Sequence, residues 1–212
     1  MTNRNKENCS FTEAYDTEAE ESGYFGPEVV FGLIYKFIQP KSDILDIGIG
    51  TGLGAALFRK AGLNVYGMDF SQNMLDACRG KGFTNLALHD LTKTPYPYDS
   101  ASMDCAVCIG VMIIFADLTP IFTETARILR KDGIFGFIVG NRAAEEPTEV
   151  VVRAEHSHMD EPITMFLHSE KQILDWLEKF GFELLRNLDF TVYMDKAKNQ
   201  NFRSKAYIVK KY

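Results

Sequence analysis

The chain has 212 residues, of which 46% are hydrophobic, and a formal net charge of −6. This length is enough for one well-buried α/β domain and too short for two ordinary ones. Because no dense cluster of lysine or arginine is present, the sequence has neither a nucleic-acid footprint nor a polybasic membrane patch. We therefore expect a small-molecule substrate, with a protein side chain as the alternative, and no nucleic acid or membrane partner. The sequence does not distinguish a monomer from a homodimer.

Cytoplasmic residence is the expected localisation. Residues 1–10 are polar and lack the apolar core of a signal peptide, and the longest apolar run, 106–116, is too short to cross a bilayer. The four cysteines are too sparse for a disulfide framework. Cys105 and Cys108 form a Cys-x-x-Cys, but in an apolar run typical of a buried strand, where residues three apart point to opposite faces. We interpret them as separate core residues rather than a redox pair or half of a zinc site.

Taken in chain order, the pattern predicts helices first and then parallel βαβ units. An acidic arm at 11–22 could be helical, and Pro27 suits the first turn of a helix that runs to Ile38. Ser71 is a predicted N-cap, and Gly62 and Gly80 are predicted helix stops. The strand candidates are 43–47, 64–69, 83–88, 103–109 and 133–139, with helices near 52–61, 71–80 and 117–130.

The pattern changes after Gly140. Residues 141–168 are polar and irregular, and no element is assigned to them. The sequence Ser169-Glu-Lys-Gln172 is a capping box, which predicts an amphipathic helix to Phe180. Two strand-like segments follow, 182–193 and 202–210, joined by a polar turn around 196–201. We expect them to form an antiparallel hairpin that closes one edge of the sheet.

The most informative segment is Ile44-Leu-Asp-Ile-Gly-Ile-Gly-Thr-Gly-Leu-Gly54, a strand that enters a glycine-rich turn and then a helix. Glycines let a ligand approach the backbone closely, and such a turn at the carboxyl edge of a parallel sheet lies where ligands bind. A tight turn alone is weak evidence, because turns need glycine without any ligand. Asp69 ends the second strand at about the spacing at which an acid binds ribose hydroxyls. Together these features predict a nucleotide-like ligand.

The details of the turn favour a methyltransferase over a nicotinamide-dependent oxidoreductase. No Gly-Lys-Ser/Thr follows the turn, which excludes a P-loop. Asp46 precedes the glycines by two residues, and a carboxylate there suits a ligand with an ammonium and a sulfonium better than a pyrophosphate. A dehydrogenase-type Tyr-x-x-x-Lys is matched by Tyr207 and Lys211, but in the terminal strand rather than on a central helix. An NAD(P)-dependent oxidoreductase and a non-catalytic cofactor-binding protein remain the alternatives.

Several linked motifs, from about Tyr15 to the end, resemble those of class I S-adenosylmethionine-dependent methyltransferases. The matching stretches are Ile44–Leu53, Val65–Leu75, His89–Leu91, Met103–Ile109 and Ala126–Phe135. Within that class, Tyr24-Phe-Gly-Pro27 and the acidic arm before it resemble the methyltransferase-like branch that includes the Williams-Beuren-region protein. The resemblance implies S-adenosylmethionine as cofactor and methyl transfer to an unidentified acceptor.

The same resemblance implies a Rossmann-like three-layer α/β sandwich, with a mostly parallel seven-stranded sheet and an antiparallel C-terminal hairpin strand. We expect a single methyltransferase domain over 1–212. Its expected parts are a helical arm or cap (1–40), a cofactor-binding core (41–140), an acceptor-side cap segment (141–168), and a C-terminal helix and hairpin (169–212).

Cofactor-binding residues follow from the resemblance position by position. They are Asp46, Gly48, Gly50, Thr51, Gly52, Asp69, Phe70, Met74, Asp90, Leu91 and Ile109. The glycines would admit the methionine part of the cofactor, with Asp46 near its amino group. The Ile109 carbonyl could accept a hydrogen bond from the same ammonium, and Asp69 would hold the ribose hydroxyls.

The remaining residues would bind the adenine. Phe70 and Met74 would pack against the ring, Asp90 would accept from its exocyclic amine, and the Leu91 amide would reach a ring nitrogen. Ordinary core packing is the alternative for Phe70 and Met74. A solvated loop acid is the alternative for Asp90.

Catalysis of methyl transfer depends mostly on placement, because the sulfonium already activates the methyl group. The acceptor must be held in near-attack geometry with water excluded, and a base is optional. In the family, the amino-terminal arm and the segment after the fifth strand usually cap the acceptor pocket; here they are 11–25 and 141–168. His156, His158 and Tyr15 are weak catalytic candidates, with hydrogen-bonded surface histidines as the alternative reading. No metal site is predicted.

Overall fold

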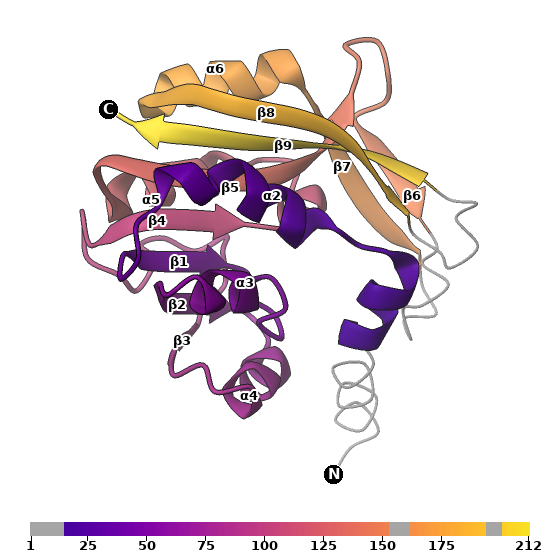
Figure 1. The fold of residues 1–212 in the computed structure, drawn as a ribbon. Helices are drawn as coiled ribbons and strands as arrows, with labels where there is room; N and C mark the ends of the chain where they lie inside the picture. Colours follow the sequence, from indigo (N-terminus) through magenta and orange to yellow (C-terminus); the bar gives the residue numbers. More distant parts are fainter. Residues whose placement is uncertain (1–14, 153–161, 194–200) are drawn as a thin grey trace.

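The computed structural model describes residues 15–152, 162–193 and 201–212, which form a nine-stranded sheet with helices on both faces (Figure 1). The named elements in chain order are α2 (Gly26–Ile34), the 3-10 turn η1 (Tyr35–Phe37), β1 (Asp43–Ile47), α3 (Ala55–Lys60), β2 (Asn64–Asp69), α4 (Gln72–Gly80), β3 (Asn85–Leu88), β4 (Met103–Cys108), the 3-10 turn η2 (Met112–Ile114), α5 (Thr119–Ile128), β5 (Leu129–Arg142), β6 (Glu149–Val152), β7 (Ile163–Ser169), α6 (Glu170–Phe180), β8 (Phe182–Tyr193) and β9 (Asn201–Lys211).

The sheet has a parallel centre in the order β3-β2-β1-β4-β5. β9 pairs antiparallel with β5, and β8 pairs antiparallel with β9. The expected fold class, a Rossmann-like α/β sandwich with an antiparallel C-terminal hairpin, is therefore confirmed. Most of the turn expected between β8 and β9, at 196–201, lies outside the described residues.

Two strands were not expected from the sequence, and they make the sheet nine-stranded rather than seven-stranded. β7 pairs in parallel with the end of β5 (Gly140↔Leu167), beyond the last β4 pair (Cys108↔Phe137). Because β9 occupies the other side of β5 as far as Gly140, β7 lies on the side of β4, past the carboxyl end of that strand. β6 pairs antiparallel with β7. Pairing with the far end of β5 is a tertiary contact, which the polar, irregular pattern of 141–168 does not indicate.

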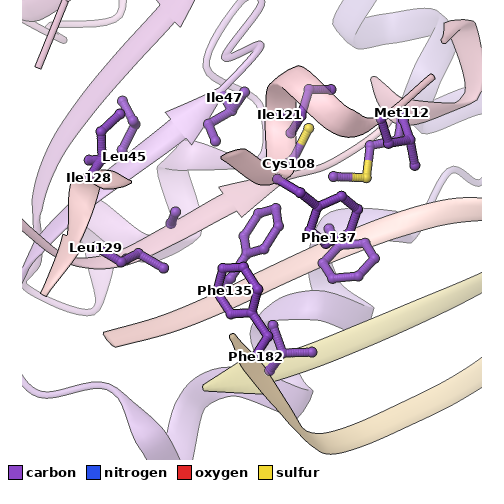
Figure 2. Packing of buried hydrophobic residues seen from close by; sticks show 14 of the residues in the cluster. Leu45, Ile47, Cys108, Met112, Ile121, Ile128, Leu129, Phe135, Phe137 and Phe182 are labelled. Atoms are coloured by element: carbon purple, nitrogen blue, oxygen red, sulfur yellow. The ribbon is translucent and has the colours of Figure 1, made fainter. Parts of the chain in front are cut away.

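The core is divided by the sheet into two layers. On one face, α2, α3 and α4 pack over strand residues that include Ile44 and Cys105. On the other face, α5 and α6 pack over strand residues that include Leu45 and Cys108. Figure 2 shows Cys108 among the aromatic and aliphatic side chains of this second layer. The two cysteines are free, buried and on opposite faces, as the strand pattern predicts.

Helix ends agree with the sequence signals in most places. Ser71 caps α4 by accepting a hydrogen bond from the Met74 N–H, and Pro27 lies in the first turn of α2. Residues 15–22 are helical, and the first part of the expected arm, 11–14, lies outside the described residues. The predicted stop at Gly80 is displaced: Gly80 is the last residue of α4, and the left-handed glycine is Gly82.

Within the described part of the chain, no helix has both the length and the apolar character needed to cross a bilayer.

The capping box of α6 is a measurable source of stability. The Ser169 hydroxyl accepts from the Gln172 N–H at 3.4 Å, and the Gln172 side chain accepts from the Ser169 N–H at 2.9 Å. We expect Ser169→Ala to lower the free energy of unfolding by about 1 kcal/mol in a urea titration followed by circular dichroism. As a control, Lys171→Ala removes an exposed ion pair on the same helix and should cost less than about 0.5 kcal/mol. Equal losses of unfolding free energy in the two variants would contradict a specific contribution from the capping box.

Candidate functional site

The glycine turn between β1 and α3 forms the base of the candidate site. Gly48, Gly50 and Gly52 all have positive φ, at 80°, 55° and 82°, a conformation that favours glycine. The N–H groups of Gly48 and Ile49 both donate to the Met68 carbonyl, at 2.8 and 3.0 Å, which fixes the turn on the end of β2. A Cβ added at Gly50 would meet no atom within 4 Å. The turn is therefore open above Gly50.

Asp69 connects this turn to the end of β2. Its carboxylate accepts hydrogen bonds from the Gly50 N–H at 3.0 Å and the Ser71 N–H at 2.9 Å, and only 7% of the residue is exposed. Burial raises the pKa of Asp69, although these N–H donors act in the opposite direction. The sequence predicts Asp69 as a ribose ligand; the structure adds that its side chain holds the turn.

Asp46, the last acid before the turn, is buried, and the part of the chain that the structure describes gives it no counter-charge. It is 4% exposed, and no hydrogen bond or ion pair to its carboxylate is found among the residues that the structure describes. Burial and the nearby Asp69 charge raise its pKa from 3.8 to about 7. A buried carboxylate of this kind would be stabilised by a cationic ligand, which is the chemistry expected of the methionine ammonium.

A pocket brings the turn together with the amino-terminal helices. Its lining residues are Tyr15, Tyr24, Pro27, Asp46, Gly48, Ile49, Gly50, Thr51, Leu53, Gly54 and Ile109. Five residues predicted to bind cofactor are in this set: Asp46, Gly48, Gly50, Thr51 and Ile109. Ile49, Leu53 and Gly54 were not named from the sequence, although they belong to the same glycine-rich segment. Pro27 reaches the pocket only through tertiary packing.

Gly52 lies on the other side of the turn. A Cβ at this position would come within 2.7 Å of the Phe83 ring and 2.9 Å of the Cys78 sulfur. Close packing against α4 and the loop that follows it is therefore sufficient to explain this glycine, and its role in ligand binding stays a prediction.

The arm is attached directly to the turn. Asp16 accepts a hydrogen bond from the Thr51 hydroxyl at 2.5 Å and forms an ion pair with Lys81, the residue that follows α4. The sequence indicates mostly solvated carboxylates in this arm, and nothing in the local pattern singles out Asp16. Its role becomes visible only when the arm is seen packed on the glycine turn.

The residues predicted to bind adenine do not line the pocket; they lie after β2 and β3 and, for Met74, in α4. Phe70 is 74% exposed, so it is not a core residue and its ring face is free. Met74 is half-buried, and the Leu91 side chain is buried. Asp90 is exposed, and its carboxylate accepts from the Thr92 N–H and hydroxyl, bonds that lower its pKa. Asp90 is therefore an ordered loop acid with an ionised side chain at neutral pH.

Of the three catalytic candidates, the structure describes Tyr15 alone. His156 and His158 lie outside the described residues. Tyr15 lines the pocket, and burial, together with the charges of Asp16, Asp69 and Asp46, raises its pKa, so its phenol is neutral at physiological pH. A neutral phenol positions a ligand by hydrogen bonding more readily than it acts as a base.

His168, the remaining histidine of the expected cap, is buried on β7. Its Nε2 lies 3.2 Å from the Phe115 carbonyl, and the ring packs edge-on against Trp176. Burial lowers its pKa, so the ring is neutral at pH 7. This environment supports a structural role, in which His168 joins β7 to the segment after η2.

Comparison with known proteins identifies the domain that carries this site. Residues 45–137 match the family model described as "Methyltransferase domain", a little less than half of the chain. Among curated proteins, the ubiquinone biosynthesis O-methyltransferase of Actinobacillus pleuropneumoniae is 24% identical over 152 residues, which cover 65% of each chain.

Solved structures share the fold. A SAM-dependent methyltransferase from Methanosarcina mazei superposes with a TM-score of 0.71 at 15% identity, over 84% of this chain and 96% of that chain. The 1,6-didemethyltoxoflavin-N1-methyltransferase of Burkholderia thailandensis, solved with S-adenosylhomocysteine and 1,6-didemethyltoxoflavin bound, has a TM-score of 0.64 at 16% identity, over 95% of this chain and 84% of that chain.

These comparisons agree with the class expected from the sequence: residues 45–137 match a methyltransferase domain, and the chain has the fold of solved S-adenosylmethionine-dependent methyltransferases. The S-adenosylhomocysteine bound in the Burkholderia structure agrees with S-adenosylmethionine as the cofactor. The chain spans about half the length of the curated relatives that it matches.

The raised pKa of Asp46 predicts a specific effect on stability. Since the folded pKa of about 7 lies above the ordinary 3.8, the unfavourable contribution of this carboxylate develops as pH rises from about 4 to 7 and is complete above pH 7. Asp46→Asn should therefore make the ligand-free protein more stable than the wild type at pH 8, by on the order of a few kcal/mol, and by less at pH 5. Thermal melts at the two pH values test this. A variant that is destabilised equally at both would contradict it.

Proposed function

We propose that this chain, which matches a methyltransferase domain at residues 45–137, transfers the methyl group of S-adenosylmethionine to a small-molecule acceptor. One observation carries the proposal: the buried Asp46 carboxylate, without a counter-charge among the described residues, faces a pocket whose floor is a glycine turn open at Gly50. This combination suits a ligand that brings both a cation and a close backbone contact.

The residues present fit the cofactor. When bound, S-adenosylmethionine supplies a methyl group already activated by its sulfonium. Asp46 would pair with the ammonium of its amino-acid end, and the Ile109 carbonyl would accept from the same group. The Asp69 carboxylate already accepts hydrogen bonds from two N–H groups, one at each oxygen. Each oxygen has a further lone pair that can accept from a ribose hydroxyl. The exposed Phe70 ring offers a face on which the adenine would stack.

Several observations support a small molecule as acceptor. The net charge of −6 and the lack of a dense basic cluster in the sequence disfavour a nucleic acid. The relative from Actinobacillus is named for ubiquinone biosynthesis, and the Burkholderia enzyme was solved with 1,6-didemethyltoxoflavin. The arm and the β6–β7 pair flank the carboxyl edge of the sheet, where they would shield an acceptor from water.

The narrower resemblance, to the branch that includes the Williams-Beuren-region protein, also belongs to this proposal. It rests on Tyr24-Phe-Gly-Pro27 and the acidic arm. Tyr24 and Pro27 both line the pocket, so the segment that carries the resemblance lies where it would affect ligand binding.

Calorimetric titration tests the cofactor. We expect S-adenosylmethionine and S-adenosylhomocysteine to bind with micromolar dissociation constants, and NADH not to bind. Asp69→Ala should abolish binding, because it removes the predicted ribose ligand and the acceptor that holds the Gly50 N–H. As a control, Asp76→Ala removes an exposed carboxylate on α4 and should bind like the wild type.

Other outcomes would favour the alternatives. Binding of NADH but of neither methionine ligand would support an oxidoreductase. Against that reading, Tyr207 is fully buried in the core and Lys211 donates to the Leu129 carbonyl at the opposite end of the sheet. Tight binding of S-adenosylmethionine without methyl transfer to any acceptor in a screen of quinol, phenol, amine and thiol compounds would support a non-catalytic binding protein.

The pKa of Asp46 predicts how cofactor affinity depends on pH. The ammonium pairs with the ionised carboxylate, so the affinity for S-adenosylhomocysteine should rise with pH and be roughly eightfold higher at pH 7.5 than at pH 6, for a free-protein pKa of about 7. Binding at pH 7 should release protons, seen as a measured enthalpy that depends on the ionisation enthalpy of the buffer. In Asp46→Asn, the affinity should be low and independent of pH. A pH dependence that survives this substitution would exclude Asp46 as its source.

A further inference from the structure

The Tyr24 hydroxyl is a polar group that the expected cofactor contacts do not explain. It is completely buried, and no hydrogen-bond partner for it is found in residues 15–152, 162–193 and 201–212. Leaving a buried hydroxyl unpaired is unfavourable, and unpaired groups of this kind are few in native proteins. Tyr24 follows the helical arm and precedes α2, and its ring is one of the walls of the pocket.

Two glycines leave the space that the Tyr24 ring occupies. A Cβ at Gly26 would lie 2.7 Å from the hydroxyl oxygen, and a Cβ at Gly110 would lie 2.8 Å from it. Gly110 directly follows the Ile109 carbonyl at the end of β4, and its φ is +75°. The phenol therefore occupies a narrow gap between the start of α2 and the end of β4, and it reaches this gap because both neighbours lack a side chain.

The hydroxyl lies at one particular end of the binding region. The residues that share the pocket with Tyr24 include Asp46, Gly48 and Ile109, all predicted to surround the amino-acid part of the cofactor. The predicted ribose and adenine residues, Asp69 and Phe70, do not line it. Burial raises the Tyr24 pKa far above its ordinary value, so the phenol is neutral and able both to donate and to accept a hydrogen bond.

We propose that Tyr24 is a positioning residue for the amino-acid end of the cofactor, and that its buried hydroxyl gains a hydrogen-bond partner when the ammonium or carboxylate of that end enters the pocket. The inference rests on the proposed function. The arm that carries Tyr24 is held on the glycine turn by the hydrogen bond between Asp16 and Thr51. The proposal therefore links the packing of this arm to cofactor binding.

Tyr24→Phe tests this proposal, with Tyr207→Phe as a matched control. Tyr207 also has a buried hydroxyl for which the described residues supply no partner, but it lies on β9, is opposite Phe137 and Asn187 in the sheet, and does not line the pocket. Both substitutions remove an unpaired buried hydroxyl, so both ligand-free variants should melt at the wild-type temperature or above it. Only Tyr24→Phe should weaken binding of S-adenosylhomocysteine, by about 5- to 30-fold.

A second ligand separates the amino-acid end from the rest of the cofactor. 5′-Methylthioadenosine has the adenosine and the sulfur but no ammonium or carboxylate, so its affinity should be the same for the wild type and Tyr24→Phe. Gly26→Ala should also weaken binding of S-adenosylhomocysteine, because the added methyl group would displace the Tyr24 hydroxyl. Gly26 itself does not line the pocket, so no lining side chain is replaced.

The outcomes distinguish this inference from the proposed function. If the wild type binds S-adenosylhomocysteine and Tyr24→Phe binds it equally well, the positioning role is excluded while the methyltransferase proposal stands. An equal loss for both ligands, or an equal loss in Tyr207→Phe, would also overturn it, because the effect would then come from the fold of the pocket. If the wild type binds neither methionine ligand, it is the proposed function that fails.

Discussion

The candidate site depends on the link between the Asp69 carboxylate and the Gly50 N–H. This bond joins the end of β2 to the glycine turn that follows β1, and the two bonds to the Met68 carbonyl act beside it. Together they hold the turn in a conformation with three positive φ angles. These hydrogen bonds offset the conformational entropy that a glycine-rich backbone loses when it is fixed. The pocket floor, the buried Asp46 and the contact with the arm all depend on where this turn lies.

Asp46 illustrates how such a site is destabilised for binding. A carboxylate buried without a partner among the described residues lowers the stability of the free protein at neutral pH, and the nearby Asp69 charge increases the effect. A ligand that brings a cation removes this penalty, so part of its affinity comes from the relief of a strain that already exists. The Tyr24 hydroxyl, which has no hydrogen-bond partner in the described part of the chain, follows the same logic, with a hydrogen bond in place of a charge.

The amino-terminal arm packs on the glycine turn and contributes two pocket-lining side chains. Asp16 holds it on Thr51 and Lys81, while Tyr15 and Tyr24 form walls around the turn. On the other side of the carboxyl edge, β7 extends the sheet past the end of β4, and His168 attaches it to the Phe115 carbonyl. The arm and β7 both lie outside residues 45–137, which match the family model. In the proposed methyl transfer, they would determine which acceptor can approach the methyl group.

Local patterns in the sequence were enough to predict the βαβ order, the capping box at Ser169, the opposite faces of Cys105 and Cys108, and the glycine turn with Asp46 and Asp69. Each of these depends on residues close together in the chain or on the alternation of a single strand. The strands β6 and β7, the Asp16–Thr51 contact and the burial of the Tyr24 hydroxyl between Gly26 and Gly110 could not be predicted in this way. They arise from contacts between segments far apart in the sequence, where packing rather than local propensity decides which groups meet.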